Sequence, residues 1–393
     1  MLKRIIKATD EIKDRLIKFR REVHQNPELS GQEEKIAAFV ATILEDNDIE
    51  LQKNVGGHGV VGRLKGFAEG PIVALRADMD ALPIEDTKKV DYASKSKGIM
   101  HACGHDAHTA ILLGVAIVLG KLRNEFKGEV IFIFQPAEES IQGAERMIKD
   151  GVLDSTPISA IAALHCLPEL EAGKIGHRAG IMTSAADRIA ISIKGKSGHA
   201  SKPQQTVDAV LVSSMVINAL HHIVSRRTDP LQPSVISIGT IRGGTAENII
   251  ADKVKMTGTV RTLDAKLRQD MPRMIENVIK GITASMNAGY DFDYTFECPS
   301  ILNNKEVDGE IRRCATDVVG SDNVIELAEP MMGSEDFALF TEKIPGALFR
   351  LGTGKPGDHE ITPLHSNTFD IDESAIAIGT KILAWWAVSS LKR

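Results

Sequence analysis

Short apolar runs alternate with helical patterns through roughly the first 180 residues of the chain. The runs at residues 72–75, 130–134 and 158–164 are continuously apolar, which is typical of parallel strands buried on both faces. Apolar residues with helical spacing accompany them at residues 33–44, 108–122 and 144–149. This alternation predicts an α/β domain in which helices flank a parallel sheet.

The middle of the chain has a different order of elements. Its patterns predict four strands and two helices, at residues 188–196, 207–225, 235–241, 254–262, 271–286 and 290–296. The order β-α-β-β-α-β is the split βαβ, or ferredoxin-like, arrangement, which is a self-contained unit. A length of 393 residues suits about two domains. We therefore predict one domain from residues 1–183 plus 297–393, and a second domain inserted at residues 184–296.

The charge balance narrows the class of partner. The chain has 47 basic and 53 acidic residues, a formal net charge of −6, whereas binding to nucleic acid needs a basic face. The sequence offers no apolar leader and no run of about 18 uncharged apolar residues. Its four cysteines are scattered without a CxxC pair, which favours a reducing compartment. We expect a cytoplasmic protein without a nucleic-acid or membrane partner.

Polar residues suited to metal chemistry follow each predicted strand. Asp78 and Asp80 follow the first strand, Glu138 and Glu139 the second, and His165 the third. Ligands in open α/β sheets bind beyond the carboxyl ends of the strands. Each residue by itself is also compatible with capping of the next helix. Three such positions at one edge favour a shared site.

A segment rich in metal-binding side chains lies at residues 101–108. It contains Cys103 and His105, which offer the thiolate and imidazole ligands of zinc and neighbouring metals. The bland alternative is a buried thiol beside a helix start capped by Asp106. We favour metal ligation for Cys103 and His105, and leave Asp106 and His108 as capping or orienting residues.

The adjacent carboxylates Glu138 and Glu139 suggest a division of labour. One can bind metal while the other takes a proton from activated water. The alternative is an acidic start of a helix, which the helix dipole stabilises.

The remaining candidates are weak signals when taken one by one. His199 lies just after a predicted strand, Asn248 ends a Gly-Gly-containing turn, Arg261 lies within a strand, and His365 stands near the end of the chain. A lone arginine in a strand is more often a surface charge, a Gly-Gly pair is more often a turn, and His365 by itself is more often an ordinary surface or capped histidine.

Taken together, these stretches resemble the dinuclear-metal aminoacylase and carboxypeptidase family. Within it they are most similar to the branch of hippurate hydrolase, N-acetyl-diaminopimelate deacetylase, auxin-conjugate hydrolases and some thermostable carboxypeptidases. The matching stretches span the chain, at residues 21–28, 75–83, 101–108, 134–139, 163–165, 198–200, 243–248, 332–337 and 364–365. The resemblance implies a metallopeptidase-like sheet domain with an inserted lid and dimerisation domain, in a homodimer or homotetramer.

The resemblance also implies a site for two divalent metal ions per chain, which can be zinc, manganese, cobalt or nickel. The implied ligands, with the first shared between the two metals, are Cys103, His105, Glu139, His165 and His365. Glu138 is then the general base.

Roles for the other candidates follow from the same resemblance. His199 helps to polarise the scissile carbonyl, from its own chain or across a dimer interface, and Asn248 and Arg261 hold the substrate's carboxylate. Asp78 and Asp80 lie where the wider family has a metal-binding histidine and an orienting aspartate, so which of them orients a ligand stays open.

The function that this set predicts is metal-dependent cleavage of the amide bond of an N-acyl amino acid. A carboxypeptidase or dipeptidase that acts on short peptides is the alternative, because it needs the same machinery. A non-catalytic binding protein of the same fold is a more distant alternative, which the intact ligand set and Glu138 disfavour.

Overall fold

The computed structural model describes the whole chain except residues 155–156, 358–359 and 393. The described chain divides into two compact units. Unit 1 comprises Met1–Met182, Ile301–Pro330 and Glu335–Arg393, and unit 2 comprises Thr183–Ser300 and Met331–Ser334. The predicted inserted domain at 184–296 falls within unit 2, and the short return of the chain at Met331–Ser334 has no counterpart in the prediction.

Eight strands in the described part of unit 1 form one mixed sheet, in the order β1-β2-β4-β3-β5-β16-β6-β15. Their bounds are β1 Glu50–Val55, β2 Gly59–Lys65, β3 Ile72–Asp78, β4 Glu129–Gln135, β5 Ile158–Glu171, β6 Ile175–His177, β15 Val324–Glu326 and β16 Gly346–Gly354. The central strands β4, β3, β5 and β16 are parallel to one another, whereas β2 and β6 pair antiparallel at either side of them. Their carboxyl ends therefore lie at one edge of the sheet.

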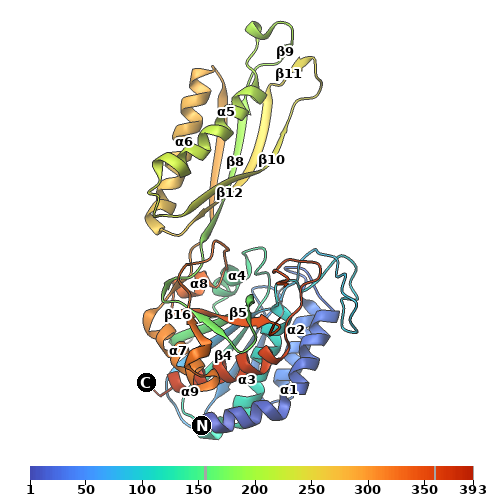
Figure 1. Ribbon diagram of the computed structural model, residues 1–393, viewed down its shortest axis with the longest axis vertical. Helices are drawn as coiled ribbons and strands as arrows, with labels where there is room; N and C mark the ends of the chain where they lie inside the picture. Colours follow the sequence, from blue (N-terminus) through green and yellow to red (C-terminus); the bar gives the residue numbers. More distant parts are fainter. Residues whose placement is uncertain (155–156, 358–359, 393) are drawn as a thin grey trace. The chain divides into compact units, whose positions relative to one another are not determined.

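The helices of unit 1 flank this sheet (Figure 1). Their bounds are α1 Leu2–Gln25, α2 Glu34–Glu45, α3 His105–Lys121, α4 Gly143–Lys149, α7 Lys305–Val319, α8 Ala338–Thr341 and α9 Ser374–Ser390. Helix α3 is buried at every position from His105 to Leu119, as expected for a helix that is apolar on all sides. It packs against α1 and α9, and at Gly114 a side chain would meet Thr380 Oγ1 at 2.9 Å.

Unit 2 has a four-stranded antiparallel sheet in the order β10-β12-β8-β13. Its elements in chain order are β8 Ala185–Lys194, α5 Ala209–His222, β10 Ser234–Gly243, β12 Lys253–Thr262, α6 Ala265–Ser285 and β13 Gly289–Cys298. Ile189, Ile191 and Ile193 alternate along β8 and belong to a core shared with α5 and α6, because successive side chains of a strand point to opposite faces. The predicted α/β fold with its inserted ferredoxin-like arrangement is confirmed.

One helical stretch, Ala209–Arg227, is apolar and long enough to cross a membrane by length and composition, with a mean hydropathy of 1.2. The sequence predicts a helix at residues 207–225 of the inserted domain and no membrane span. Val212, Val216 and Leu220 on this stretch are buried in the core of unit 2, and this packing accounts for part of its apolar character. Val210, Leu211 and Met215 on the same stretch are exposed.

Candidate metal centre

The candidate ligands and carboxylates of unit 1 converge at the carboxyl edge of its parallel strands. Strand β3 ends at Asp78, and β4 ends at Gln135, three residues before Glu138. His165 was expected just after a strand but lies inside β5, because β5 continues beyond it in parallel pairing with β16. Helix α3 begins at His105, three residues earlier than predicted. Neighbouring strands and one helix start therefore supply these side chains.

All five predicted ligands come together in one cluster. Ligand atoms lie within 4.8 Å of one another in three overlapping groups: Cys103, His105 and His165; Cys103, Glu139 and His365; and His105, Glu138 and Glu139. The Cys103 Sγ and His165 Nε2 atoms are 3.5 Å apart, and His365 Nε2 lies 3.6 Å from Glu139 Oε1. Since Cys103 and Glu139 each belong to two groups, the cluster is continuous.

The chemistry of these side chains fits divalent metal ions. His105 Nε2 and Glu139 Oε1 are buried and have no hydrogen-bond partner in the described part of the chain. Buried polar atoms in native structures are nearly always satisfied, so two orphaned ligand atoms in one cluster fit a site that holds a cation. Thiolate, imidazole and carboxylate together suit zinc and other first-row metals.

Two histidines of the cluster are oriented by main-chain carbonyls. His105 Nδ1 donates to the carbonyl oxygen of Asp80 over 2.9 Å, and His165 Nδ1 donates to that of Cys166 over 2.9 Å. A donor role for Nδ1 leaves the lone pair on Nε2, the nitrogen that faces the cluster. This tautomer is the one that metal ligation requires.

The two aspartates after β3 make different contacts. Asp78 accepts hydrogen bonds from Arg76 at 2.7 Å and from His108 Nδ1 at 2.6 Å. Asp80 Oδ2 accepts from Ser30 Oγ at 2.6 Å and from the main-chain N–H of Glu139 at 3.0 Å. Asp80 is thus tied to the segment that carries a ligand, whereas Asp78 joins a buried ion-pair network.

That network centres on Arg76, which sequence reasoning did not select. Arg76 is buried and also donates to Gln135, Glu335 and Asp336, over 2.8, 2.9 and 3.1 Å. Its sequence signal was its place as a charged residue directly after the predicted apolar run at residues 72–75, within the longer strand β3 of the structure. Because a buried ion needs partners of opposite charge, Arg76 fixes the acidic residues of the network in place.

Glu138 lies at the junction of the ligand cluster and this network. It is buried, and it shares a group with His105 and Glu139 and another with Glu335 and Asp336. Burial, followed by the neighbouring carboxylates of Glu335 and Glu139, raises the pKa of Glu138 well above its ordinary value. A carboxylate in such surroundings readily takes up a proton.

Asp106 supports the start of α3 without capping it. Its Oδ2 accepts hydrogen bonds from Arg20 Nε at 2.6 Å and from His24 Nδ1 at 2.7 Å, and no side chain caps α3. Arg20 and His24 belong to α1; Arg20 was missed from the sequence, and His24 lies in the matching stretch 21–28 but was given no role. They anchor the residue that follows His105.

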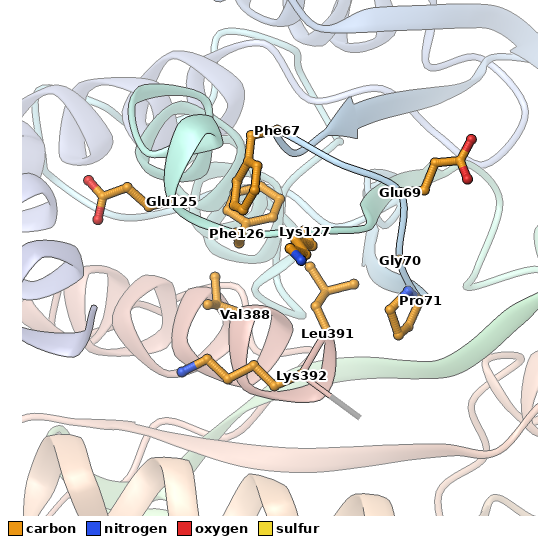
Figure 2. A pocket seen from close by; sticks show the side chains of 10 residues that line it. All are labelled: Phe67, Glu69, Gly70, Pro71, Glu125, Phe126, Lys127, Val388, Leu391 and Lys392. Carbon is orange, nitrogen blue, oxygen red and sulfur yellow. The ribbon is translucent and has the colours of Figure 1, made fainter.

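A cavity of about 470 Å³ lies elsewhere in unit 1 (Figure 2). It is lined by Phe67, Pro71, Phe126, Lys127 and Leu391, among others. Pro71 immediately precedes β3, and Lys127 lies two residues before β4. The cavity is therefore at the amino ends of these strands, the edge opposite the ligand cluster.

The three candidates for substrate contact lie in unit 2. His199 pairs with Ile249, and the main-chain N–H of Ala200 donates to the carbonyl of Asn248 over 3.0 Å, so His199 and Asn248 are close. Arg261 lies at the far end of β12, where it hydrogen-bonds Ser334. One copy of unit 2 does not bring Arg261 together with the other two.

A largely buried cluster of thiol, imidazole and carboxylate ligands, open at the exposed His365 and with the additional carboxylate of Glu138 beside it, defines a metal-dependent hydrolase. The chain belongs to the peptidase family M20/M25/M40, whose model matches residues 74–388. This membership confirms the resemblance drawn from the motifs.

Three similar proteins illustrate the family. The chain is 44% identical to an N-acyl-L-amino acid amidohydrolase of Geobacillus stearothermophilus over 77% of this chain and 82% of that protein. It is 39% identical to thermostable carboxypeptidase 2 of Saccharolobus solfataricus over 96% of each chain. A solved Bacillus subtilis structure, described as a dinuclear metal-binding peptidase of the M20 family, matches with a TM-score of 0.85 and 36% identity over 98% of this chain and 99% of that one.

Replacing Cys103 by serine should weaken metal retention by about tenfold or more, because a neutral hydroxyl replaces a thiolate. Elemental analysis after dialysis against graded chelator measures this loss. Cys314→Ser is the matched control, since Cys314 is a buried free cysteine in the core of unit 1, on α7. Equal retention in wild type and Cys103→Ser would remove Cys103 from the ligand set.

Proposed function

We propose that this hydrolase binds two divalent metal ions per chain and cleaves the amide bond of N-acyl amino acids. The observation that carries the proposal is the convergence of Cys103, His105, Glu139, His165 and His365 beside Glu138. The similarity to an N-acyl-L-amino acid amidohydrolase over most of the chain supports the substrate class.

In this proposal Glu138 is the general base. Divalent metal ions, when bound, supply Lewis-acid chemistry that activates water and polarises the amide carbonyl. The Glu138 carboxylate accepts the proton of the attacking water and returns it to the leaving amine nitrogen. Glu139 is assigned to metal because it groups with Cys103 and His365, whereas Glu138 faces other carboxylates.

Asp80 is the better candidate for the orienting carboxylate. Its carbonyl accepts from the Nδ1 of His105 and its side chain accepts from the main chain of Glu139, so it contacts two proposed ligands. Asp78 contributes indirectly by holding His108, whose Nε2 accepts from the N–H of Cys166, the residue after His165.

The ligand set is compatible with several divalent metals. A mixture of sulfur, nitrogen and oxygen ligands accepts zinc, manganese, cobalt or nickel. We further propose a cytoplasmic location, which is consistent with the four free cysteines, because reduced thiols persist in that compartment.

A hydrolysis screen tests the proposal directly. N-acetyl, N-benzoyl and indole-acyl amino acids are compared with dipeptides, and release of free amino acid is measured. We expect a higher kcat/KM for at least one N-acyl amino acid than for any dipeptide, and loss of activity with chelator that added metal restores. Preferred cleavage of dipeptides would favour the carboxypeptidase or dipeptidase alternative, which the similarity to a carboxypeptidase motivates.

The different roles proposed for Glu138 and Glu139 give a further prediction. Glu138→Gln keeps its shape but cannot accept the proton, so kcat should fall by about 10²–10⁴-fold with metal content near wild type. Glu139→Gln should instead lose metal, since an amide oxygen is a poorer ligand than a carboxylate. Turnover and metal content are measured side by side. The opposite pattern would show that the two roles are reversed.

Unit 2 is proposed as the lid and dimerisation module. Val210, Leu211 and Met215 of α5 and Val235 and Ile241 of β10 are exposed, and α5 packs against β10. Strand β10 is at an edge of its sheet. Neighbouring exposed apolar side chains and an open strand edge are features of a subunit interface. We propose a second copy of the chain as the partner, in a homodimer or an assembly of dimers.

A dimer also explains the separation of the substrate residues. Within unit 2, His199 and Asn248 lie apart from Arg261. We propose that each site uses Arg261 of one chain, while His199 and Asn248 of the second chain polarise the carbonyl and hold the carboxylate.

Complementation between inactive variants tests this shared site. A heterodimer of His199→Ala and Arg261→Ala chains, co-expressed with two tags, should carry one intact site of two and recover about half of wild-type activity. A heterodimer of His199→Ala and Asn248→Ala is the control and should stay inactive. Each site takes both His199 and Asn248 from the second chain, so each of the two sites lacks one of these residues. A stable heterodimer of the first kind without activity would overturn the shared site.

A further inference from the structure

The turn that carries Glu138 and Glu139 has an unusual backbone. Ala137 and Ile141 both adopt left-handed conformations, each with φ of 55°, which non-glycine residues rarely adopt because Cβ meets the backbone. The N–H groups of Gln142 and Gly143 both donate to the carbonyl of Ala137. A side chain at Gly143 would lie 1.6 Å from the carbonyl oxygen of Pro136. The turn therefore closes tightly on itself around the proposed general base.

A buried carboxylate from the N-terminal segment holds this turn. Glu33 is buried, and its Oε1 accepts hydrogen bonds from the main-chain N–H groups of Ala137 and Gly31, each over 2.8 Å. Ala137 is itself buried, and a buried N–H without a partner would be costly. The N–H group of the left-handed Ala137 is thus satisfied by the side chain of Glu33, about a hundred positions away in the sequence.

The side chain of Glu33 has no role in its own helix. Glu33 precedes α2 but makes no capping hydrogen bond to it. Glu28 performs that role instead, because its Oε2 accepts from the N–H groups of Lys35 and Ile36, over 2.8 and 3.0 Å. Glu33 Oε2 has no hydrogen-bond partner in the described residues. The contact that explains this buried carboxylate is therefore the one with the turn.

The same N-terminal segment makes a second contact with the site. Ser30 Oγ donates to Asp80 Oδ2, and this oxygen accepts the N–H of Glu139. The short stretch 30–33 thus fixes the turn on both sides of Glu138. This stretch lies outside residues 74–388, which the family model matches.

We infer that Glu33 is a positioning residue, which holds Ala137 in its left-handed conformation and thereby aims the Glu138 carboxylate at the reacting water. The inference rests on the proposed function, since it assigns Glu33 to the reaction through Glu138. Glu33 contacts the turn and not the cluster of ligands. Because Asp80 Oδ2 still accepts the N–H of the ligand Glu139, loss of Glu33 should lower kcat with little change in KM or metal content.

Four variants test the inference. Glu33→Ala should lower kcat about tenfold. Without Glu33, Ala137 can relax from its left-handed conformation, and the energy that separates the two conformations corresponds to about a factor of ten in rate. Glu33→Gln should stay near wild type, because its amide oxygen can accept both hydrogen bonds. Adding Ala137→Gly to Glu33→Ala should restore most of kcat, since glycine adopts a positive φ without steric cost. Glu28→Ala is the matched control, and kcat should not change when this other carboxylate of the segment is lost.

A second measurement does not depend on substrate or metal. Amide hydrogen exchange of the metal-free protein should be faster across residues 137–142 in Glu33→Ala than in wild type, with little change elsewhere, and Glu28→Ala should leave this segment protected. If wild type hydrolyses none of the substrates, the proposed function fails while the exchange data still decide the role of Glu33.

The inference is overturned if Glu33→Ala keeps wild-type kcat and exchange, or if Ala137→Gly does not raise the kcat of Glu33→Ala. If the Glu33→Ala protein fails to fold, the double variant Glu33→Ala with Ala137→Gly becomes the test. If Glu33→Ala with Ala137→Gly is also unfolded, Glu33 is needed for folding in general and the inference fails.

Discussion

Buried negative charge at the carboxyl edge of β3, β4 and β5 is the constraint on which the rest of the structure depends. Asp78, Asp80 and Glu138 are buried there together, and buried charges are costly unless they are paired. Arg76 offsets part of this cost by forming ion pairs with Asp78, Glu335 and Asp336. The ligand cluster beside it needs further positive charge, which divalent cations supply. Metal binding and the stability of this edge are therefore coupled.

Much of this arrangement could be predicted because it rests on strong local patterns. Continuous apolar runs identified β3, β4 and β5, and parallel strands place their carboxyl ends at one edge. The adjacency of Cys103 and His105 and the pair Glu138 and Glu139 are likewise local. A signal confined to a few neighbouring residues needs no knowledge of tertiary contacts.

What could not be predicted depends on contacts between distant segments. Strand β1 was missed because most of its residues are exposed and polar, and β2 was missed because Gly62 and Arg63 interrupt its short apolar run. Arg76 looks like an interruption of a strand until Glu335 and Asp336 are placed beside it. The partner of Glu33 is a main-chain N–H, for which no residue type gives a sequence signal.

The division of the chain into two units also separates two kinds of chemistry. Every proposed ligand and the proposed base lie in unit 1, on elements tied to a sheet and a buried helix. His199, Asn248 and Arg261 lie in unit 2, which also carries the exposed apolar side chains of the proposed contact surface. In the proposed mechanism metal retention therefore depends on unit 1 and substrate recognition on unit 2, so that changes in unit 2 would alter specificity without disturbing the buried charges that the metals would balance.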